Sequence, residues 1–476
     1  MTIARHHHWI GGRQVSPSNG EYFEDLNPID DSLYAEIARG EPKDVELAVE
    51  TAHASFAGYR QSLPKQREAW LLRAAELLEA RASEFIDTLI DEVGSPILKA
   101  QREVETSIGI LRSAAGATRQ LAGKTLPTDV PGRLSMSIRR PLGVIAGISP
   151  FNVPLIKDIK HSAMPLATGN PVVLLPSEHA PVTALKVAEL FAEAGFPAGA
   201  FNVVTGLGAE IGDTLTCHPQ VRMVGFTGSS RIGHHISALC GKHAKRYSLE
   251  MGGKNPLVIL QDAELDKAVQ GSVIGSFLYQ GQICMASSRI YVEKSIHDHF
   301  LTKFLAAVQS LGMEDLRSPS TMIGPIIHER QRKRIKQHLH DAISKGATVR
   351  CGGNWKGNRC EPTVLTGVED QMLISHEETF GPVTTIHAVD SADEALRLAN
   401  ASNLGLSASI YTSNLTQAMR FAEELEVGMV HVNGTTIQDE PHIPFGGVGD
   451  SGFGRESTDP DLSEFTEWKW VTVQHR

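Results

Sequence analysis

Apolar residues recur every three to four positions between about Lys43 and Arg119, among residues that favour helices. The repeat is clearest in "DVELAVETAHASFAGYR" and "REAWLLRAAELLEARASEFIDTLIDEV". This period places apolar side chains on one face of a helix. The first quarter of the chain therefore predicts a layer of helices.

The pattern changes at Leu142, where short β-rich runs begin: "LGVIAGI", "PVVLL", "FNVV" and "RMVGF". Helical stretches such as "VTALKVAELFAEAG" separate them. Strands that alternate with helices at this spacing are typical of parallel βαβ units. We expect a doubly wound sheet.

A second alternation follows "LEMGGKNPLVIL", with "SRIYVE", "GPVTTIHAV", "SASIYT" and "GMVHVNG" as predicted strands and "IHDHFLTKFLAAVQSL" and "SADEALRLANASN" as predicted helices. This predicts a second α/β domain from about Met251. Ligand sites are common between domains, so the boundary is a place to look for the active site.

Two stretches alternate apolar and polar residues outside both domains: "TDVPGRLSMSIRR" and "SEFTEWKWVTVQHR". Alternation of this kind predicts strands. Exposed strand edges often pair with another subunit, which makes both stretches candidates for an oligomer contact.

The composition is that of a soluble globular protein, with 41% hydrophobic and 21% charged residues among 476 and a net charge of −10. No basic stripe with interleaved aromatic residues is present, so nucleic acid is excluded as a partner. No apolar run approaches the about 18 residues that span a bilayer, and the N-terminus lacks a secretory signal. We expect a cytoplasmic protein with no membrane partner.

The five cysteines are scattered and odd in number, without a C-x-x-C motif, so neither disulfides nor a zinc site are indicated. The run His6-His7-His8 lacks spaced partner ligands and is interpreted as a solvated terminus. We predict no metal site.

Cys284 lies in "YQGQICMASSR". A free cysteine taken alone is more often a packed core residue than a nucleophile. The small neighbours Gly281, Ala286, Ser287 and Ser288 nevertheless leave room for a substrate to reach the sulfur. Both interpretations stay open on this stretch alone.

Glu250 ends a predicted strand in "SLEMGGKNP" and is followed by two glycines. Such an acid is usually a turn carboxylate, but the carboxyl end of a strand also suits a general base that faces a crevice. Asn152 lies between Pro150 and Pro154 in "ISPFNVPL", in a turn that excludes helix. Its amide is either a local hydrogen bonder or a donor to an oxyanion.

"FTGSSRIGHHI" carries Gly228 and Gly233 at a predicted strand-to-helix turn, where backbone amides and the helix dipole favour phosphate. The dinucleotide fingerprint G-x-G-x-x-G is absent, because the other cluster, in "TGLGAEIG", has a different spacing. "GDSGF" resembles the nucleophile segment of trypsin-like proteases, but those enzymes are β-barrels, and we reject Ser451 as a nucleophile.

Together these stretches resemble the aldehyde dehydrogenase superfamily over nearly the whole chain. The matching pieces follow the family's order: "PFNVP", "GNPVVLLPSE", "FTGSSRIG", "LEMGGKNP", "GQICMASSR", "EETFGPV" and "PFGGVGDSGFGRE". The resemblance implies an α/β fold with a Rossmann-like cofactor domain, a second α/β catalytic domain and a small β oligomerisation element. It implies domain bounds of 1–124 and 142–250, 251–435, and 125–141 with 455–476.

The resemblance also implies roles. Cys284 is the nucleophile, Glu250 the general base and Asn152 an oxyanion donor, with NAD as cofactor. Glu378 and Phe380 hold the nicotinamide riboside, Glu178 faces the adenine-side ribose, and Ser229 binds the pyrophosphate. The cofactor-binding set is Ser149, Pro150, Phe151, Pro176, Ser177, Glu178, Gly208, Gly212, Phe226, Gly228, Ser229, Ile232, Gly233, Glu378 and Phe380.

Leu175 departs from the family, which usually has a lysine there that contacts the adenosine ribose or the 2′-phosphate of NADP. Its loss favours NAD, because Glu178 repels a 2′-phosphate. The tail resembles that of bacterial enzymes that oxidise aromatic aldehydes such as benzaldehyde, vanillin or salicylaldehyde. The alternatives are an aliphatic aldehyde or semialdehyde dehydrogenase, a CoA-acylating dehydrogenase and a non-catalytic binding relative. The resemblance further implies a homodimer or homotetramer.

Overall fold

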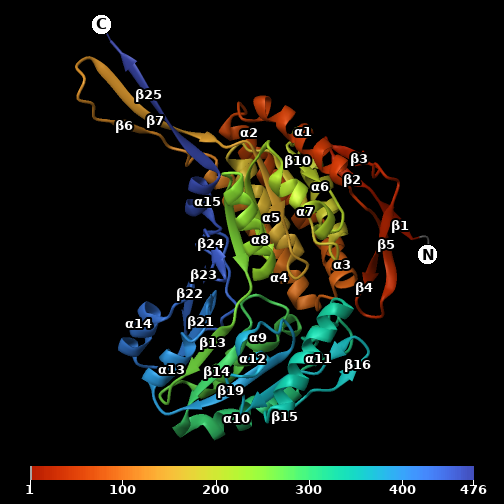
Figure 1. Cartoon of the computed structure of the whole chain (residues 1–476), viewed down its shortest axis with the longest axis vertical. Coiled ribbons are helices and arrows are strands. Elements are labelled where there is room, and N and C mark those ends of the chain that lie inside the picture. The colour runs from red at the N-terminus through yellow and green to blue at the C-terminus, as the bar shows by residue number, and fades with distance from the viewer. Residues whose placement is uncertain (1–2, 476) are drawn as a thin grey trace.

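Two large sheets organise the chain, one in each half of the computed structural model, which describes residues 3–475 (Figure 1). The first sheet has the strand order β24-β12-β11-β8-β9-β10-β2-β3. Its five central strands, from β12 to β10, are parallel. In chain order the strands are β2 (His8–Ile10), β3 (Arg13–Val15), β8 (Val144–Ile148), β9 (Val172–Leu175), β10 (Phe201–Val203), β11 (Val221–Gly228), β12 (Arg246–Met251) and β24 (Gly452–Phe453).

Helices cover both faces of this sheet, as the doubly wound prediction requires. Val172 and Leu174 of β9 pack into one core, whereas Val173 and Leu175 pack into the other. This alternation follows from the pleat of the strand. The first core takes α2 (Pro64–Ala80), α3 (Ala82–Val93), α4 (Ile97–Ala117), α5 (Pro154–Ala167) and α6 (Pro181–Glu193), and the second takes α1 (Pro42–Tyr59), α7 (Gly208–Cys217) and α8 (Ser230–Lys242).

The second sheet has the order β15-β18-β19-β14-β13-β21-β22, and its strands are parallel except for β15. The strands are β13 (Asn255–Ile259), β14 (Ser287–Glu293), β15 (Thr348–Cys351), β18 (Thr363–Thr366), β19 (Val383–Val389), β21 (Ser407–Tyr411) and β22 (Met429–Val432). The accompanying helices are α9 (Leu265–Phe277), the 3₁₀ turn η1 (Leu278–Gly281), α10 (Lys294–Gln309), α11 (Glu329–Ser344), α12 (Leu373–His376), α13 (Ala392–Ala399) and α14 (Leu415–Glu424).

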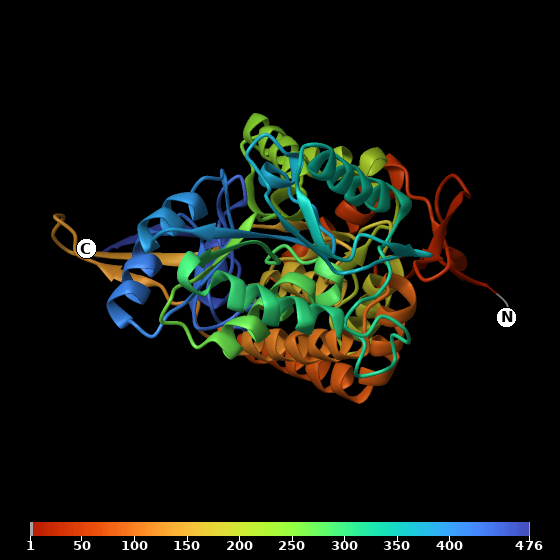
Figure 2. The same ribbon diagram turned by 90° about the horizontal axis from the view of Figure 1, so that it is seen from below.

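A three-stranded arm projects from the body of the molecule (Figures 1 and 2). It consists of β6 (Lys124–Leu126), β7 (Arg133–Pro141) and β25 (Thr466–Gln474), and α15 (Thr458–Glu464) precedes β25. β7 and β25 are antiparallel along their whole length. Both stretches predicted as alternating strands therefore form strands, and they pair with each other.

The N-terminal segment is where the sequence interpretation was wrong. Strands β1 (Ala4–His6), β4 (Tyr22–Asn27) and β5 (Ser32–Ala38) form a small sheet that the pattern did not reveal. His8 is fully buried on β2 and its ring lies 3.1 Å from the Thr205 hydroxyl. The histidine run is thus part of the fold rather than a solvated terminus, because β2 extends the first sheet.

The remaining strands are two short ladders, β16 (Trp355–Lys356) with β17 (Arg359–Cys360) and β20 (Leu404–Gly405) with β23 (Val448–Gly449). Among the described helices, none combines the length and the apolar character that crossing a bilayer requires. Within residues 3–475, no three histidine, cysteine or acidic side chains gather as metal ligands do.

Candidate functional site

The loop that carries Cys284 begins with three residues in the left-handed region. The φ angles are 50° at Tyr279, 46° at Gln280 and 68° at Gly281. A Cβ at Gly281 would stand 2.2 Å from the carbonyl oxygen of Gly381, so only glycine fits there. The Gln280 side chain donates to the Pro325 carbonyl at 2.7 Å, and this hydrogen bond stabilises the turn. Such backbone strain persists where surrounding contacts enforce it.

The backbone of Cys284 is fixed from β13. The Asn255 side-chain amide donates to the carbonyl oxygens of Cys284 and Ala286, at 2.8 and 2.9 Å. The thiol packs beside an apolar cluster that includes Ile283 and Phe445. Burial, and then the negative charge of Glu250, raises the pKa of the Cys284 thiol well above its usual range. The sulfur therefore rests in the neutral thiol form.

Glu250 lies at the carboxyl end of β12 and is 3% exposed. The strand end is held by the "GDSGF" segment, because the Met251 amide donates to the Ser451 carbonyl at 2.9 Å and the Ser451 hydroxyl donates to the Gly252 carbonyl at 2.6 Å. Ser451 is fully buried. It supports the strand of Glu250.

Lys157 is a functional candidate that the sequence interpretation missed. Its ammonium lies 2.7 Å from the Glu250 carboxylate and 2.6 Å from that of Glu456. Lys160, one turn further along α5, pairs with Asp439 at 2.9 Å. A lysine on a predicted helix carries no signal of this role. The only hint in the sequence is that Lys157 follows Asn152 closely along the chain.

Lys157 and the carboxylates beside it stabilise one another in their charged forms. Although burial alone would lower the pKa of Lys157, the Glu250 and Glu456 carboxylates raise it overall. Burial opposes ionisation of Glu456, but Lys157 and Lys160 outweigh it and lower the pKa of Glu456 to about 2. Lys157 is therefore a permanent cation between two carboxylates.

Asn152 follows β8 in a turn that ends where Pro154 begins α5. It is 4% exposed, and its side-chain amide makes no hydrogen bond within residues 3–475. An amide that is almost enclosed and keeps both N–H donors is suited to bind an oxyanion. The neighbouring Ser149 hydroxyl donates to Asp158 at 2.5 Å and anchors the turn.

Glu378 and Phe380 lie just before β19 of the second sheet, and Glu378 is close enough to Cys284 and Glu250 to interact with both electrostatically. The Glu378 carboxylate accepts from the Gly253 amide at 3.2 Å, and burial raises its pKa to about 7. Phe380 has a φ of 53° and meets the Phe151 ring edge-on, with 5.9 Å between ring centres. Gln331 donates to the Phe380 carbonyl at 2.9 Å, which fixes this strained turn.

Two histidines extend the aromatic contact between the halves of the molecule. The rings of His179 and His328 lie 4.4 Å apart, and the Phe151 ring meets both edge-on. Burial lowers the pKa of each histidine to about 4, so both are neutral near pH 7. Sequence reasoning did not identify this pair.

The predicted dinucleotide residues line the carboxyl ends of the first sheet. α8 starts directly after β11 with Ser229 at its N-cap. The Ile232 amide donates to the Ser229 carbonyl at 3.0 Å, whereas the Ser230 and Arg231 amides have no backbone partner within residues 3–475. A Cβ at Gly208 would stand 4.0 Å from the Glu178 carboxylate, and one at Gly212 would meet nothing within 4 Å. Unpartnered amides at a helix N-terminus are suited to bind a phosphate group.

The other predicted residues of this set lie on or next to the same strands. The Ser149 amide donates to the Leu175 carbonyl at 3.1 Å, which joins the two predicted turns. Gly233 approaches Met251 so closely that a Cβ would lie 2.2 Å from its sulfur. Leu175 itself is 1% exposed and offers no charge to a ligand. Of the remaining predicted residues, two are buried, Pro176 and Phe226, and four are half-buried, Pro150, Ser177, Gly228 and Ile232.

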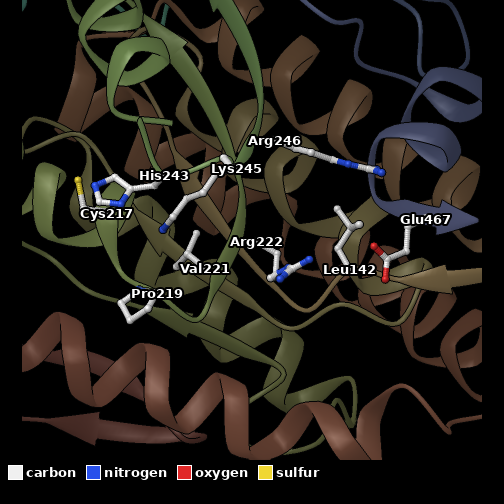
Figure 3. Close-up of a pocket in the computed structure, with 10 residues that line it drawn as sticks. Leu142, Cys217, Pro219, Val221, Arg222, His243, Lys245, Arg246 and Glu467 are labelled. Carbon is white, nitrogen blue, oxygen red and sulfur yellow. The ribbon is translucent and has the colours of Figure 1, made fainter. Parts of the chain in front are cut away.

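A separate surface hollow of about 500 Å³ lies at the opposite end of β12 (Figure 3). Its lining includes Arg222, Lys245 and Arg246, with Leu142 and Glu467 at one side. Arg246 begins the strand that Glu250 nearly ends. The hollow therefore contains none of the predicted site residues.

Known proteins resemble this chain along its full length. The sequence profile of the aldehyde dehydrogenase family matches residues 15–471. Vanillin dehydrogenase of Pseudomonas fluorescens is 37% identical over 98% of this chain and 97% of that protein.

Two solved structures superpose with a TM-score of 0.96 each. One is a salicylaldehyde dehydrogenase from Pseudomonas putida G7 complexed with salicylaldehyde, 36% identical over 99% of this chain and 98% of that one. The other is betaine aldehyde dehydrogenase of Staphylococcus aureus in complex with NAD⁺, 30% identical over 98% of this chain and 95% of that one. The predicted α/β fold is confirmed.

Replacing Lys157 tests the buried ion pairs. Lys157→Met leaves buried Glu250 without its cation and Glu456 with Lys160 alone, and we expect the free energy of unfolding to fall by about 3–5 kcal/mol. The matched control is Lys303→Met, because Lys303 pairs with Asp266 at an exposed site. Its loss should stay below about 1 kcal/mol. Urea denaturation measures both, and equal losses would contradict the assigned role.

Proposed function

The chain belongs to the aldehyde dehydrogenase family and is an oxidoreductase, and we propose that it oxidises an aromatic aldehyde to the carboxylic acid with NAD. One observation carries the proposal: Cys284 and Glu250 face each other, with Lys157 paired to the carboxylate. A nucleophile beside a general base is the arrangement that acyl chemistry requires.

The Cys284 sulfur attacks the aldehyde carbon. Because its pKa is raised, the thiol must lose its proton as it attacks, and Glu250 is the carboxylate that acts on it most strongly. The carbonyl oxygen becomes an oxyanion in the thiohemiacetal. The free Asn152 amide and the Cys284 backbone N–H donate to it.

Glu378 and Phe380 would hold NAD at its nicotinamide end, and the cofactor would supply the acceptor for the hydride of the thiohemiacetal carbon. The product on Cys284 is a thioester. After the first proton has passed from Glu250 to solvent, Glu250 takes a proton from water, which attacks the thioester carbonyl and releases the acid with the Cys284 thiolate as leaving group. The ion pair with Lys157 holds the Glu250 carboxylate in place. A general base argues for water rather than CoA as the acyl acceptor.

The surroundings of Cys284 support an aromatic substrate. The apolar cluster beside the thiol contains Ile283, Met285 and Phe445, with Leu278 and Ile437 at its margin. Mostly apolar walls with few polar groups are typical of sites for small aromatic ligands. Relatives named for vanillin and salicylaldehyde support the same substrate class.

Replacing Cys284 tests the chemistry. Cys284→Ala should lower NADH formation from benzaldehyde by at least about 10³-fold, because no other group supplies the nucleophile. Cys351→Ala is the control, since Cys351 lies on β15 among apolar residues, and it should keep full activity.

The same assay with and without CoA separates the alternatives. Strict dependence on CoA would favour an acylating enzyme. A complete lack of NADH formation from a broad panel of aldehydes, semialdehydes included, would favour a binding protein. Preference for aliphatic aldehydes in that panel would overturn the aromatic assignment.

Leu175 predicts the choice of cofactor. We expect a higher kcat/KM with NAD than with NADP, because Glu178 repels a 2′-phosphate and no lysine stands at position 175. A higher kcat/KM for NADP in the unsubstituted enzyme would defeat the argument.

The arm supports a homodimer or homotetramer. β25 is the outer strand of its sheet, so one edge has unpaired backbone groups. Its faces expose large apolar side chains, among them Trp470 at 67%. A second copy of this chain is the proposed partner, and the other exposed residues are Leu126, Leu134, Ile138, Trp468 and Val473.

Trp470→Lys tests the assembly. A charge on the exposed face of β25 should lower the molar mass measured by light scattering to roughly half or less, because a buried unpaired ammonium is costly. Leu415→Lys is the control, since Leu415 is 74% exposed on α14. A monomeric unsubstituted protein, or an unchanged mass in Trp470→Lys, would contradict the proposed contact.

A further inference from the structure

Lys254 is a buried cation for which the mechanism above has no use. Its side chain is fully buried, and the amine has no hydrogen-bond partner within the described part of the chain. An isolated ammonium in such a place is strongly disfavoured. Either a neighbouring anion compensates it or the amine is neutral.

The groups around Lys254 decide between these states. Arg334 and His338 already pair with Glu377, at 3.1 and 3.3 Å. Arg289 donates to backbone carbonyls. Within residues 3–475 the Glu378 carboxylate has no ion-pair partner, and the cations that act on it are Arg334 and then Lys254. The titratable or charged groups that face Lys254 or Glu378 are Arg289, Arg334, His338, Glu377, His387 and Glu250.

The Glu378 carboxylate is pressed against the main chain just before Lys254. Its oxygen stands 2.2 Å from where a Cβ on Gly252 would lie, and it accepts from the Gly253 amide. The Glu378 carboxylate therefore contacts the two residues that immediately precede Lys254 in the chain. Burial lowers the pKa of Lys254 to about 7 and raises that of Glu378 to about 7, so both titrate in the same range.

We propose that Lys254 is a positioning residue that supplies the countercharge for Glu378 when that carboxylate holds the nicotinamide ribose of NAD. This inference rests on the proposed function. Ribose hydroxyls donate to an ionised carboxylate and favour its charged form. Ionised Glu378 in turn favours the protonated amine of Lys254, which then has its anion.

The affinity for NAD should decrease as the pH is lowered. NAD requires ionised Glu378, so affinity is full above the pKa of Glu378 and falls as the pH drops through it, about tenfold per pH unit for one proton. Lys254 lowers that pKa by its positive charge. Removing the charge must therefore move the midpoint upward.

The test is the dissociation constant of NAD, measured by tryptophan fluorescence from about pH 6 to about pH 9. The midpoint should move upward by about one unit or more in Lys254→Met and downward in Lys254→Arg, whose charge is permanent. Glu378→Gln should abolish the dependence. The control Lys267→Met, at an exposed position paired with Glu264, should leave the midpoint unchanged.

Opposite shifts in the methionine and arginine variants cannot arise from a loss of packing alone. Should Lys254→Met fail to fold, Lys254→Arg and Glu378→Gln still give the test. An unchanged midpoint in Lys254→Arg would overturn the inference and leave the proposed function intact. Failure of the unsubstituted protein to bind NAD at any pH would overturn both.

Discussion

One buried ammonium joins the parts of the chain that carry the chemistry. Lys157 comes from α5, Glu250 from the end of β12, and Glu456 from the segment after β24. Without a cation between them, two carboxylates would face each other in a medium of low dielectric. The fold brings these distant segments together at the point where the Lys157 charge compensates both.

The same carboxylate that Lys157 holds also controls the sulfur. Burial and Glu250 keep Cys284 a neutral thiol at rest, and a thiol is a far weaker nucleophile than a thiolate. Reactivity thus depends on proton transfer to a base that is already in position. The strained turn at Tyr279 and Gln280 completes this arrangement, since packing rather than intrinsic preference determines where the sulfur lies.

Local patterns predicted most of the fold. The three-to-four repeat predicted the helical layer, and the runs around Val172 and Ile290 predicted strands of the two sheets, because burial on both faces leaves continuous apolar stretches. The strands before Lys43 were missed, because they are short and half exposed. His8 is buried by a contact with Thr205, far along the chain, which no local window detects.

Some residues of the candidate site were likewise found from the sequence, and others were not. The resemblance supplied candidates for the nucleophile, the base and the cofactor contacts, and these remain predictions that the geometry supports. Lys157, Lys254 and the His179–His328 pair were not found, because each depends on a partner brought close only by the tertiary fold. A lysine in a sequence is most often a solvated side chain, and burial alone distinguishes these two.

Glu178 and Glu378, the two carboxylates proposed to hold the riboses of NAD, differ in their surroundings. At the proposed adenosine end, Glu178 is half-buried, and Leu175 is buried and brings no charge. At the nicotinamide end, Glu378 lies against Gly253 and its carbonyl accepts from Arg334 at 2.9 Å. The carboxylate that is held against the backbone is therefore the one proposed to orient the nicotinamide, where hydride transfer requires a defined geometry.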